Sequence, residues 1–282
     1  MLGRIKALLL RLTDRRPVVK CDVVSLAPNE LLKNRRALIT GGTSGIGYSI
    51  AQAYLKAGAS VIITGRSEER LQKACASLSD FGECKGLVLD NRNVKQFDGI
   101  IQDLTKERTI DILVNNAGVN SHGMPNASEE DYDQVLDTNL KGVFFLSQTV
   151  AKYMVQKGIR GNILNICSSS SQRPAISAYT LSKWGLRGLT LGLAKSLVSH
   201  GITVNGLAPG AVATPMLHKG LDSDMSYTAS PIGRYILPEE IANMSVFLVS
   251  GMGRSIVGDI IYMTGGMAVT TFDDINYNVF SK

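Results

Sequence analysis

Short apolar segments alternate with longer amphipathic segments from residue 36 almost to the end of the chain. The short segments are apolar throughout rather than at every second position, which is typical of strands buried on both faces of a parallel sheet. The expected strands cover residues 36–40, 60–64, 86–89, 110–114, 162–166, 202–207 and 256–263, and helices are expected over 45–56, 128–156 and 177–198 and from residue 67. This pattern predicts one α/β domain over residues 36–282, a doubly wound Rossmann-type fold with helices on both faces of the sheet.

The positive charge of the chain is concentrated before this domain. Residues 1–36 hold nine basic and three acidic side chains, which equals the net charge of +6 of all 282 residues. The remainder therefore carries no net charge and lacks the clustered basic surface that binding to a phosphate backbone requires. We expect residues 1–35 to form a basic N-terminal extension, and we expect no nucleic-acid partner.

The first part of this extension has the spacing of a basic amphipathic helix, with Leu2, Ile5, Leu8, Leu9 and Leu12 recurring on one face. Such a helix would pack on its own domain or on a second subunit, or would lie on an anionic membrane surface. Arg11 interrupts the apolar run and no small-residue cleavage site follows, so we expect a cytoplasmic protein. The four cysteines have no metal-ligand spacing, which predicts free thiols and no metal site.

A glycine-rich segment joins the first expected strand to the first expected helix. Its sequence is Thr40-Gly41-Gly42-Thr43-Ser44-Gly45-Ile46-Gly47. Gly41 would let the chain turn off the strand, Gly45 would let a pyrophosphate approach the backbone, and Gly47 would let the helix pack closely on the sheet. A glycine loop between a strand and a helix N-terminus predicts a dinucleotide site. The candidate cofactor contacts here are Gly41, Thr43, Ser44, Gly45, Ile46 and Gly47.

Four further short motifs follow in order. They are Asn115-Asn116-Ala117-Gly118 after the fourth expected strand, Asn139 within a long helix, Tyr179-x-x-x-Lys183 at the start of the next helix, and Pro209-Gly210 after the sixth strand. With the glycine segment they cover about residues 36–266 and resemble the motif set of the classical short-chain dehydrogenases/reductases. The resemblance implies a nicotinamide dinucleotide contacted by Asp90, Asn116, Ala117, Gly118, Tyr179, Lys183, Pro209, Gly210, Val212 and Thr214, with Asp90 near the adenine.

The same resemblance implies a catalytic group of Asn139, Ser168, Tyr179 and Lys183. Tyr179 and Lys183 are four residues apart and share a helix face, where the ammonium would stabilise a phenolate that acts as general acid or base. Lys183 would also hold the nicotinamide ribose, and Asn139 would anchor a water that relays protons. Ser168 would donate a hydrogen bond to the substrate oxygen. Ten residues separate Ser168 from Tyr179, whereas about twelve are usual in the family, so Ser169 or Ser170 remains an alternative.

The choice of cofactor depends on the charge beside the adenosine ribose. Gly65 stands at the end of the second expected strand, where relatives that prefer NAD carry Asp, and Arg66 follows it. A guanidinium suits a 2′-phosphate, so we expect NADP rather than NAD. Two observations leave the choice open: Arg66 could instead stack on adenine or pair with Glu68 or Glu69, and Ser44 stands where NADP-dependent relatives often have a basic residue.

These residues predict an NADP(H)-dependent oxidoreductase that transfers a hydride between nicotinamide and a small carbonyl or alcohol substrate. Residues 215–234 are the expected lid, and their mixed composition does not identify the substrate. Three alternatives remain: a 3-oxoacyl-carrier-protein reductase, an NAD-dependent polyol or sugar dehydrogenase, and a non-catalytic NADP-binding sensor. The resemblance also implies a homodimer or homotetramer that pairs through residues 128–156 and 177–198 and the C-terminal segment.

Overall fold

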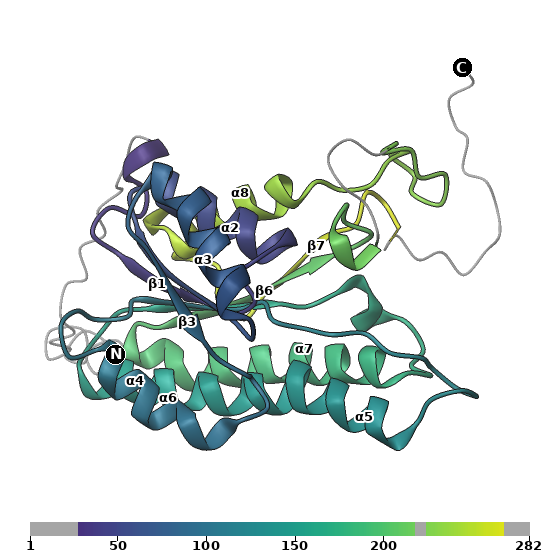
Figure 1. The fold of residues 1–282 in the computed structure, drawn as a ribbon, viewed down its shortest axis with the longest axis horizontal. Helices are drawn as coiled ribbons and strands as arrows, with labels where there is room; N and C mark the ends of the chain where they lie inside the picture. The colour runs from purple at the N-terminus through teal and green to yellow at the C-terminus, as the bar shows by residue number, and fades with distance from the viewer. Residues whose placement is uncertain (1–27, 218–223, 268–282) are drawn as a thin grey trace, which may run out of the picture.

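The computed structural model describes residues 28–217 and 224–267. Its centre is one parallel sheet of seven strands, drawn edge-on in Figure 1. The strands are β1 (Arg36–Ile39), β2 (Ser60–Gly65), β3 (Cys84–Val88), β4 (Ile112–Asn115), β5 (Asn162–Ile166), β6 (Thr203–Pro209) and β7 (Ile260–Met263). They lie in the order β3-β2-β1-β4-β5-β6-β7. The chain therefore moves outward from β1 to one edge and then resumes on its other side at β4, as in a doubly wound fold.

Helices cover both faces of this sheet. One layer holds α2 (Gly45–Lys56), α3 (Glu68–Leu78) and α8 (Pro238–Val249), and the opposite layer holds α4 (Phe97–Leu104), α5 (Glu129–Leu136), α6 (Gly142–Gln156) and α7 (Ala178–Leu197) (Figure 1). This arrangement confirms the Rossmann-type fold predicted from the alternating pattern.

The strands bury side chains on both faces because each face has its own apolar core. Ala37 and Ile39 of β1 belong to the core beneath α2 and α8. Leu38, between them, belongs to the core formed with α4, α6 and α7. All three side chains are 0% exposed. Successive side chains of a strand point to opposite faces, so a strand with helices on both sides buries residues at every position. Most of these are apolar, and buried polar ones such as Asn165 are hydrogen-bonded.

The structure differs from the expected elements at several places. Strand β3 begins at Cys84 rather than at residue 86, and most of its side chains are exposed because it forms an edge of the sheet. Only the last four residues of the segment 256–263 form a strand. Helices α4 and α8 were not assigned from the sequence, and a π-helical turn (Asp137–Lys141) separates α5 from α6.

The expected extension ends in a segment packed on the domain. Residues 1–27 lie outside the described residues, but Leu32 is fully buried and its N–H donates to the Ala57 carbonyl at 2.8 Å. The Arg35 guanidinium donates to the Val249 and Asp111 carbonyls and to Asn162 Oδ1 at 3.2, 3.0 and 2.7 Å. The Arg35 guanidinium therefore connects the starts of β4 and β5 with the end of α8 instead of adding to a basic surface. In the part of the chain that the structure describes, no helix is long and apolar enough to cross a membrane.

Candidate active site

A cavity of about 790 Å³ runs along the carboxyl ends of the strands, across the point between β1 and β4 where the chain reverses direction. Ligands of open α/β sheets bind at this position. The cavity brings together nearly all of the predicted site residues. Those that line it are Gly41, Thr43, Ser44, Gly45, Ile46, Arg66, Asp90, Asn116, Ala117, Gly118, Ser168, Tyr179, Lys183, Pro209, Gly210, Val212 and Thr214. Gly47 and Asn139 are not among the lining residues.

The glycine turn forms the wall of the cavity between β1 and α2. Gly41 and Gly45 have φ angles of +66° and +56°, a left-handed conformation that glycine adopts without strain. A Cβ at Gly45 would lie 3.3 Å from Cγ2 of Thr214, which also lines the cavity. Ser44 precedes α2 and makes no side-chain capping bond. The first N–H groups of α2 have no partner within the helix, so this end offers donors and a positive dipole to a phosphate.

Thr40 and Asn116 attach the glycine turn to the loop after β4. The Thr40 hydroxyl accepts the N–H groups of Asn116 and Ala117, both at 3.0 Å. The Asn116 amide donates to the carbonyls of Thr40 and Gly41 at 2.9 and 3.0 Å. A Cβ at Gly47 would overlap with Asn116 Nδ2 and the Gly41 carbonyl. Gly47 therefore does not line the cavity but lets α2 close against the two loops that do.

At the β2 and β3 end, the cavity is lined by two arginines and one carboxylate. Arg66 and Arg70 lie on the same side of it, and Asp90 follows β3. Hydrogen bonds from Arg92 to Asp90, the shortest at 2.7 Å, hold the pKa of Asp90 below its usual range, and Arg66 adds to this effect. Among the described residues, Arg66 forms no ion pair with Glu68 or Glu69. Arg70, in the first turn of α3, was not predicted as a site residue; Arg66 precedes the helix, so their spacing of four residues was no sign that they share a face.

At the other end, Tyr179 and Lys183 extend from the first two turns of α7. Lys183 is 5% exposed, and its Nζ donates to the Ile166 carbonyl at the end of β5 at 2.8 Å. The same Nζ lies 5.7 Å from the centroid of the Tyr179 ring. The structure thus places the ammonium beside the phenol, as predicted from their spacing, and both side chains line the cavity.

Three consecutive serines after β5 line the cavity next to this pair. Ser168 is 8% exposed, and its Oγ accepts the Ser170 N–H at 3.1 Å. This bond fixes the position of the oxygen and leaves the hydroxyl proton free to donate. Ser169 and Ser170 also line the cavity, whereas Ser171 is fully buried and donates to the Ser168 carbonyl at 2.7 Å.

Asn139 lies behind the cavity wall, in the π-helical turn. Its Nδ2 donates to the Val119 carbonyl at 2.9 Å and to Ser182 Oγ at 3.2 Å, and its Oδ1 accepts the Val119 N–H at 2.8 Å. Ser182 in turn donates to the Tyr179 carbonyl at 2.7 Å. The side chain therefore joins the loop after β4 to the start of α7. Its predicted role as anchor of a relay water stays a prediction.

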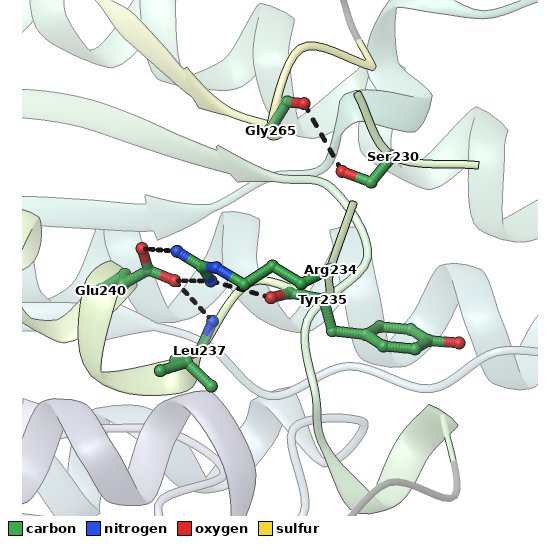
Figure 2. A network of polar contacts seen from close by, with 6 residues as sticks. All are labelled: Ser230, Arg234, Tyr235, Leu237, Glu240 and Gly265. Atoms are coloured by element: carbon green, nitrogen blue, oxygen red, sulfur yellow. Dashed lines mark hydrogen bonds and ion pairs between the residues drawn. The ribbon is translucent and has the colours of Figure 1, made fainter. Parts of the chain in front are cut away.

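Two stacked tyrosines line a further part of the cavity, and one of them, Tyr235, was not predicted from the sequence. Tyr227 and Tyr235 stack with ring centroids 4.4 Å apart, and both line the cavity. Figure 2 shows how the second ring is held: Arg234, next to Tyr235, forms two bonds of 2.8 and 2.9 Å with Glu240 at the start of α8. This segment has no periodic pattern from which the contact could be predicted. Residues 218–223 of the expected lid lie outside the described residues.

Comparisons with known proteins agree with this geometry. The model of the short chain dehydrogenase family matches residues 35–224. Gluconate 5-dehydrogenase of Gluconobacter oxydans is 36% identical over 253 residues, covering 85% of this chain and 96% of that protein. A 3-oxoacyl-[acyl-carrier-protein] reductase of Chlamydia muridarum is 36% identical over 249 residues, covering 85% of this chain and 100% of that protein.

A solved structure gives the same result in three dimensions. The crystal structure of a gluconate 5-dehydrogenase from Burkholderia cenocepacia, in complex with NADP and tartrate, matches with a TM-score of 0.78 and 32% identity. The match covers 86% of this chain and 99% of that one. Family model, sequence relatives and fold agree, and the chain belongs to the short-chain dehydrogenase/reductase family of oxidoreductases.

Proposed function

We propose that the chain is an NADP(H)-dependent oxidoreductase that transfers a hydride between nicotinamide and a carbonyl or alcohol carbon. The observation that carries this proposal is the shared cavity, which a glycine turn lines at one place and Ser168, Tyr179 and Lys183 line at another. The lining residues fit a dinucleotide for two reasons. The N-terminus of α2 has no side-chain cap, so its N–H groups are available to a phosphate. A Cβ at Gly45 would take up space beside this N-terminus, so glycine keeps that space open. When bound, the nicotinamide supplies or accepts the hydride.

Each catalytic side chain has a task that follows from its surroundings. Tyr179 gives a proton to the substrate oxygen during reduction and takes it back during oxidation. Lys183 has two N–H groups besides the one that it donates to Ile166, and these serve the phenol oxygen and the cofactor ribose. Ser168 donates its free proton to the substrate oxygen as negative charge develops there. Asn139 holds the start of α7 against the loop after β4 and, in this proposal, anchors the water that relays protons.

We propose NADP rather than NAD as the cofactor. Arg66 and Arg70 both line the adenosine end of the cavity, and Gly65 stands where a carboxylate would repel a 2′-phosphate. The carboxylate that does line this end, Asp90, is paired with Arg92. Arg70 supplies the second cation that the glycine turn lacks at Ser44. Four of the solved structures that match this chain contain NADP, which supports the same choice.

Replacing Tyr179 with phenylalanine tests the mechanism. We expect turnover of NADPH with a ketone panel to fall by about 10²–10⁴-fold, because the variant loses its general acid, while the Kd for NADPH changes less than about twofold. Tyr132→Phe is the matched control, since Tyr132 is an exposed tyrosine of α5 outside the cavity. A Tyr179→Phe variant as active as the control would refute the assignment.

Two substrate classes follow from the relatives, gluconate-like hydroxy acids and 3-oxoacyl groups on a carrier protein. We propose the first. The resemblance places carrier-protein docking at arginines near the ends of the two long helices, where this chain has Gly158 and His200, with Arg160 nearby. Arg160 packs against Gly201, since a Cβ built there would lie 3.0 Å from its Nε. A docking surface for an acidic carrier protein therefore has little support.

We also propose that the chain is a homodimer or homotetramer. Helices α6 and α7 present large apolar side chains that are exposed in the single chain: Phe144, Phe145, Leu181, Trp184 and Leu191 are 39–47% exposed. Burial of such a surface against a second copy stabilises an assembly. Light scattering at several protein concentrations tests this, and a monomer at every concentration would contradict it.

A further inference from the structure

The charged side chains that line the cavity are distributed unequally. Among the described residues they are four cations, Arg66, Arg70, Arg173 and Lys183, and one carboxylate, Asp90. The first two arginines and Asp90 belong to the adenosine end. Lys183 lies at the proposed reacting centre. Arg173 is the remaining charge; it follows the three serines in the chain, and its side chain is exposed to solvent.

Hydrogen bonds of the main chain hold Arg173 relative to both catalytic elements. Its N–H donates to the Ser170 carbonyl at 3.2 Å, within the same turn that begins at Ser168. Its carbonyl accepts the indole N–H of Trp184 at 2.8 Å, and Trp184 follows Lys183 directly on α7. The base of the arginine side chain is therefore fixed relative to the serine hydroxyl and to the lysine.

The Arg173 guanidinium has no carboxylate partner among the described residues, and no acidic side chain of those residues lines this end of the cavity. A planar guanidinium binds a carboxylate through two parallel hydrogen bonds, and an arginine that lines a pocket without an internal counter-charge favours an anionic ligand. Arg173 also lies in the segment between Ser168 and Tyr179, where this chain departs from the usual family spacing.

The wall of the cavity suits a small hydroxylated molecule. The stacked rings of Tyr227 and Tyr235 offer apolar surface, and Tyr227 also offers a phenol oxygen. Such a wall can contact the C–H groups and the hydroxyls of a short polyhydroxy chain, while Arg173 binds a charged end.

We infer that Arg173 binds a carboxylate of the substrate, so that the enzyme acts on a hydroxy acid or keto acid rather than on a neutral ketone or polyol. This inference rests on the proposed function, because it places the carboxylate in the cavity of the proposed reacting groups. It assigns to Arg173 a substrate-selecting contact and no part in proton or hydride transfer.

Binding to the NADPH complex tests the inference without turnover, because the test compounds are alcohols and NADPH has no ketone to reduce in them. D-Gluconate and D-glucitol differ only at C1, where one has a carboxylate and the other a hydroxymethyl group. By calorimetry at saturating NADPH we expect D-gluconate to bind at least about 10-fold more tightly than D-glucitol. Arg173→Gln should weaken the binding of D-gluconate about 10- to 100-fold, as loss of a charged hydrogen bond does. Binding of D-glucitol should change less than about threefold.

Two variants serve as controls for this measurement. Arg173→Lys keeps the charge but loses the planar fork, so it should retain part of the selectivity. Arg187→Gln removes a positive charge nearby that does not line the cavity. The guanidinium carbon of Arg187 lies 5.6 Å from the centroid of the Trp184 ring. This variant should bind D-gluconate like the wild type. Three results would overturn the inference. The wild-type protein could bind the two compounds equally, it could fail to bind D-gluconate, or the Arg173→Gln variant could keep the selectivity for D-gluconate.

Kinetics separate this inference from the proposed function. 5-Keto-D-gluconate and L-sorbose form the corresponding pair of ketones, and we expect Arg173→Gln to raise KM for the first with little change in kcat. Selective, Arg173-dependent binding of D-gluconate without turnover of either ketone would support the carboxylate site and refute the oxidoreductase. Oxidation of NADPH with equal kcat/KM for both ketones would support the oxidoreductase and refute the carboxylate site.

Discussion

Replacing Gly47 with alanine tests whether the glycine turn is as closely packed as the structure shows. The added Cβ would overlap with Asn116 Nδ2 and with the carbonyl of Gly41, and Asn116 Cγ would lie at 3.1 Å. A main-chain carbonyl cannot move away as a flexible side chain can, and Asn116 is held by bonds to Thr40 and Gly41. We therefore expect the substitution to shift the two loops that line the cofactor end of the cavity.

The magnitude follows from two opposing effects. Overpacking a closely packed site costs about 1–3 kcal/mol, whereas alanine favours a helix over glycine by about 0.5–1 kcal/mol. The net loss in the free energy of unfolding is about 1–2 kcal/mol, which lowers Tm by roughly 2–6 °C in a domain of this size. Gly99 of α4 is the matched control, because nothing lies within 4 Å of a Cβ built there. Gly99→Ala should raise Tm by about 1–3 °C.

Urea and thermal unfolding of both variants, with and without NADPH, measure these effects. Gly47→Ala should also weaken NADPH binding in a fluorescence titration, while Gly99→Ala should bind as the wild type does. If Gly47→Ala raises Tm as Gly99→Ala does, the residues around Gly47 accommodate the added methyl group without a loss of stability. That result would refute the packing argument and the role given to Gly47.

Three further predictions concern single ionisable groups. Arg234 holds the pKa of Glu240 at about 2, below its ordinary 4.5, so this carboxylate contributes stability above pH 4.5 that is lost as pH falls towards 2. The urea midpoint of Glu240→Gln should lie below that of the wild type at pH 7, and the gap should narrow below pH 4.5; a gap independent of pH would contradict this. Burial, with Cys75 adjacent, raises the pKa of Cys84 to about 12. Iodoacetamide at pH 8 should therefore alkylate Cys84 more slowly in the folded chain than in the urea-unfolded chain. Equal rates would disprove the raised pKa of this thiol. Arg66→Gln should raise the Kd for NADPH about 10-fold, as loss of a charge-assisted hydrogen bond does, and leave that for NADH unchanged; equal weakening of both would show that Arg66 does not contact a 2′-phosphate.

Local patterns in the sequence were sufficient for the architecture and for bringing most of the predicted site residues to one cavity. Mostly apolar strands indicated a sheet covered on both faces, and the core residues Ala37, Leu38 and Ile39 confirm this. The spacing of Tyr179 and Lys183 placed both on one face of α7 because helix geometry repeats regularly. Strand β3 was misplaced by two residues because an edge strand lacks the continuous apolar pattern of the central ones.

The sequence by itself determined which segments become strands and helices and which motifs meet at the carboxyl edge of the sheet, since these follow from periodicity and from the topology of parallel strands. Only the tertiary structure decided that Arg70 and Tyr235 line the same cavity. It also decided that Asn139 and Gly47 lie behind the cavity wall, where they join the elements that form it. These positions depend on irregular turns and on contacts between residues far apart in the chain. No local repeat encodes such contacts, because packing of the complete domain sets them.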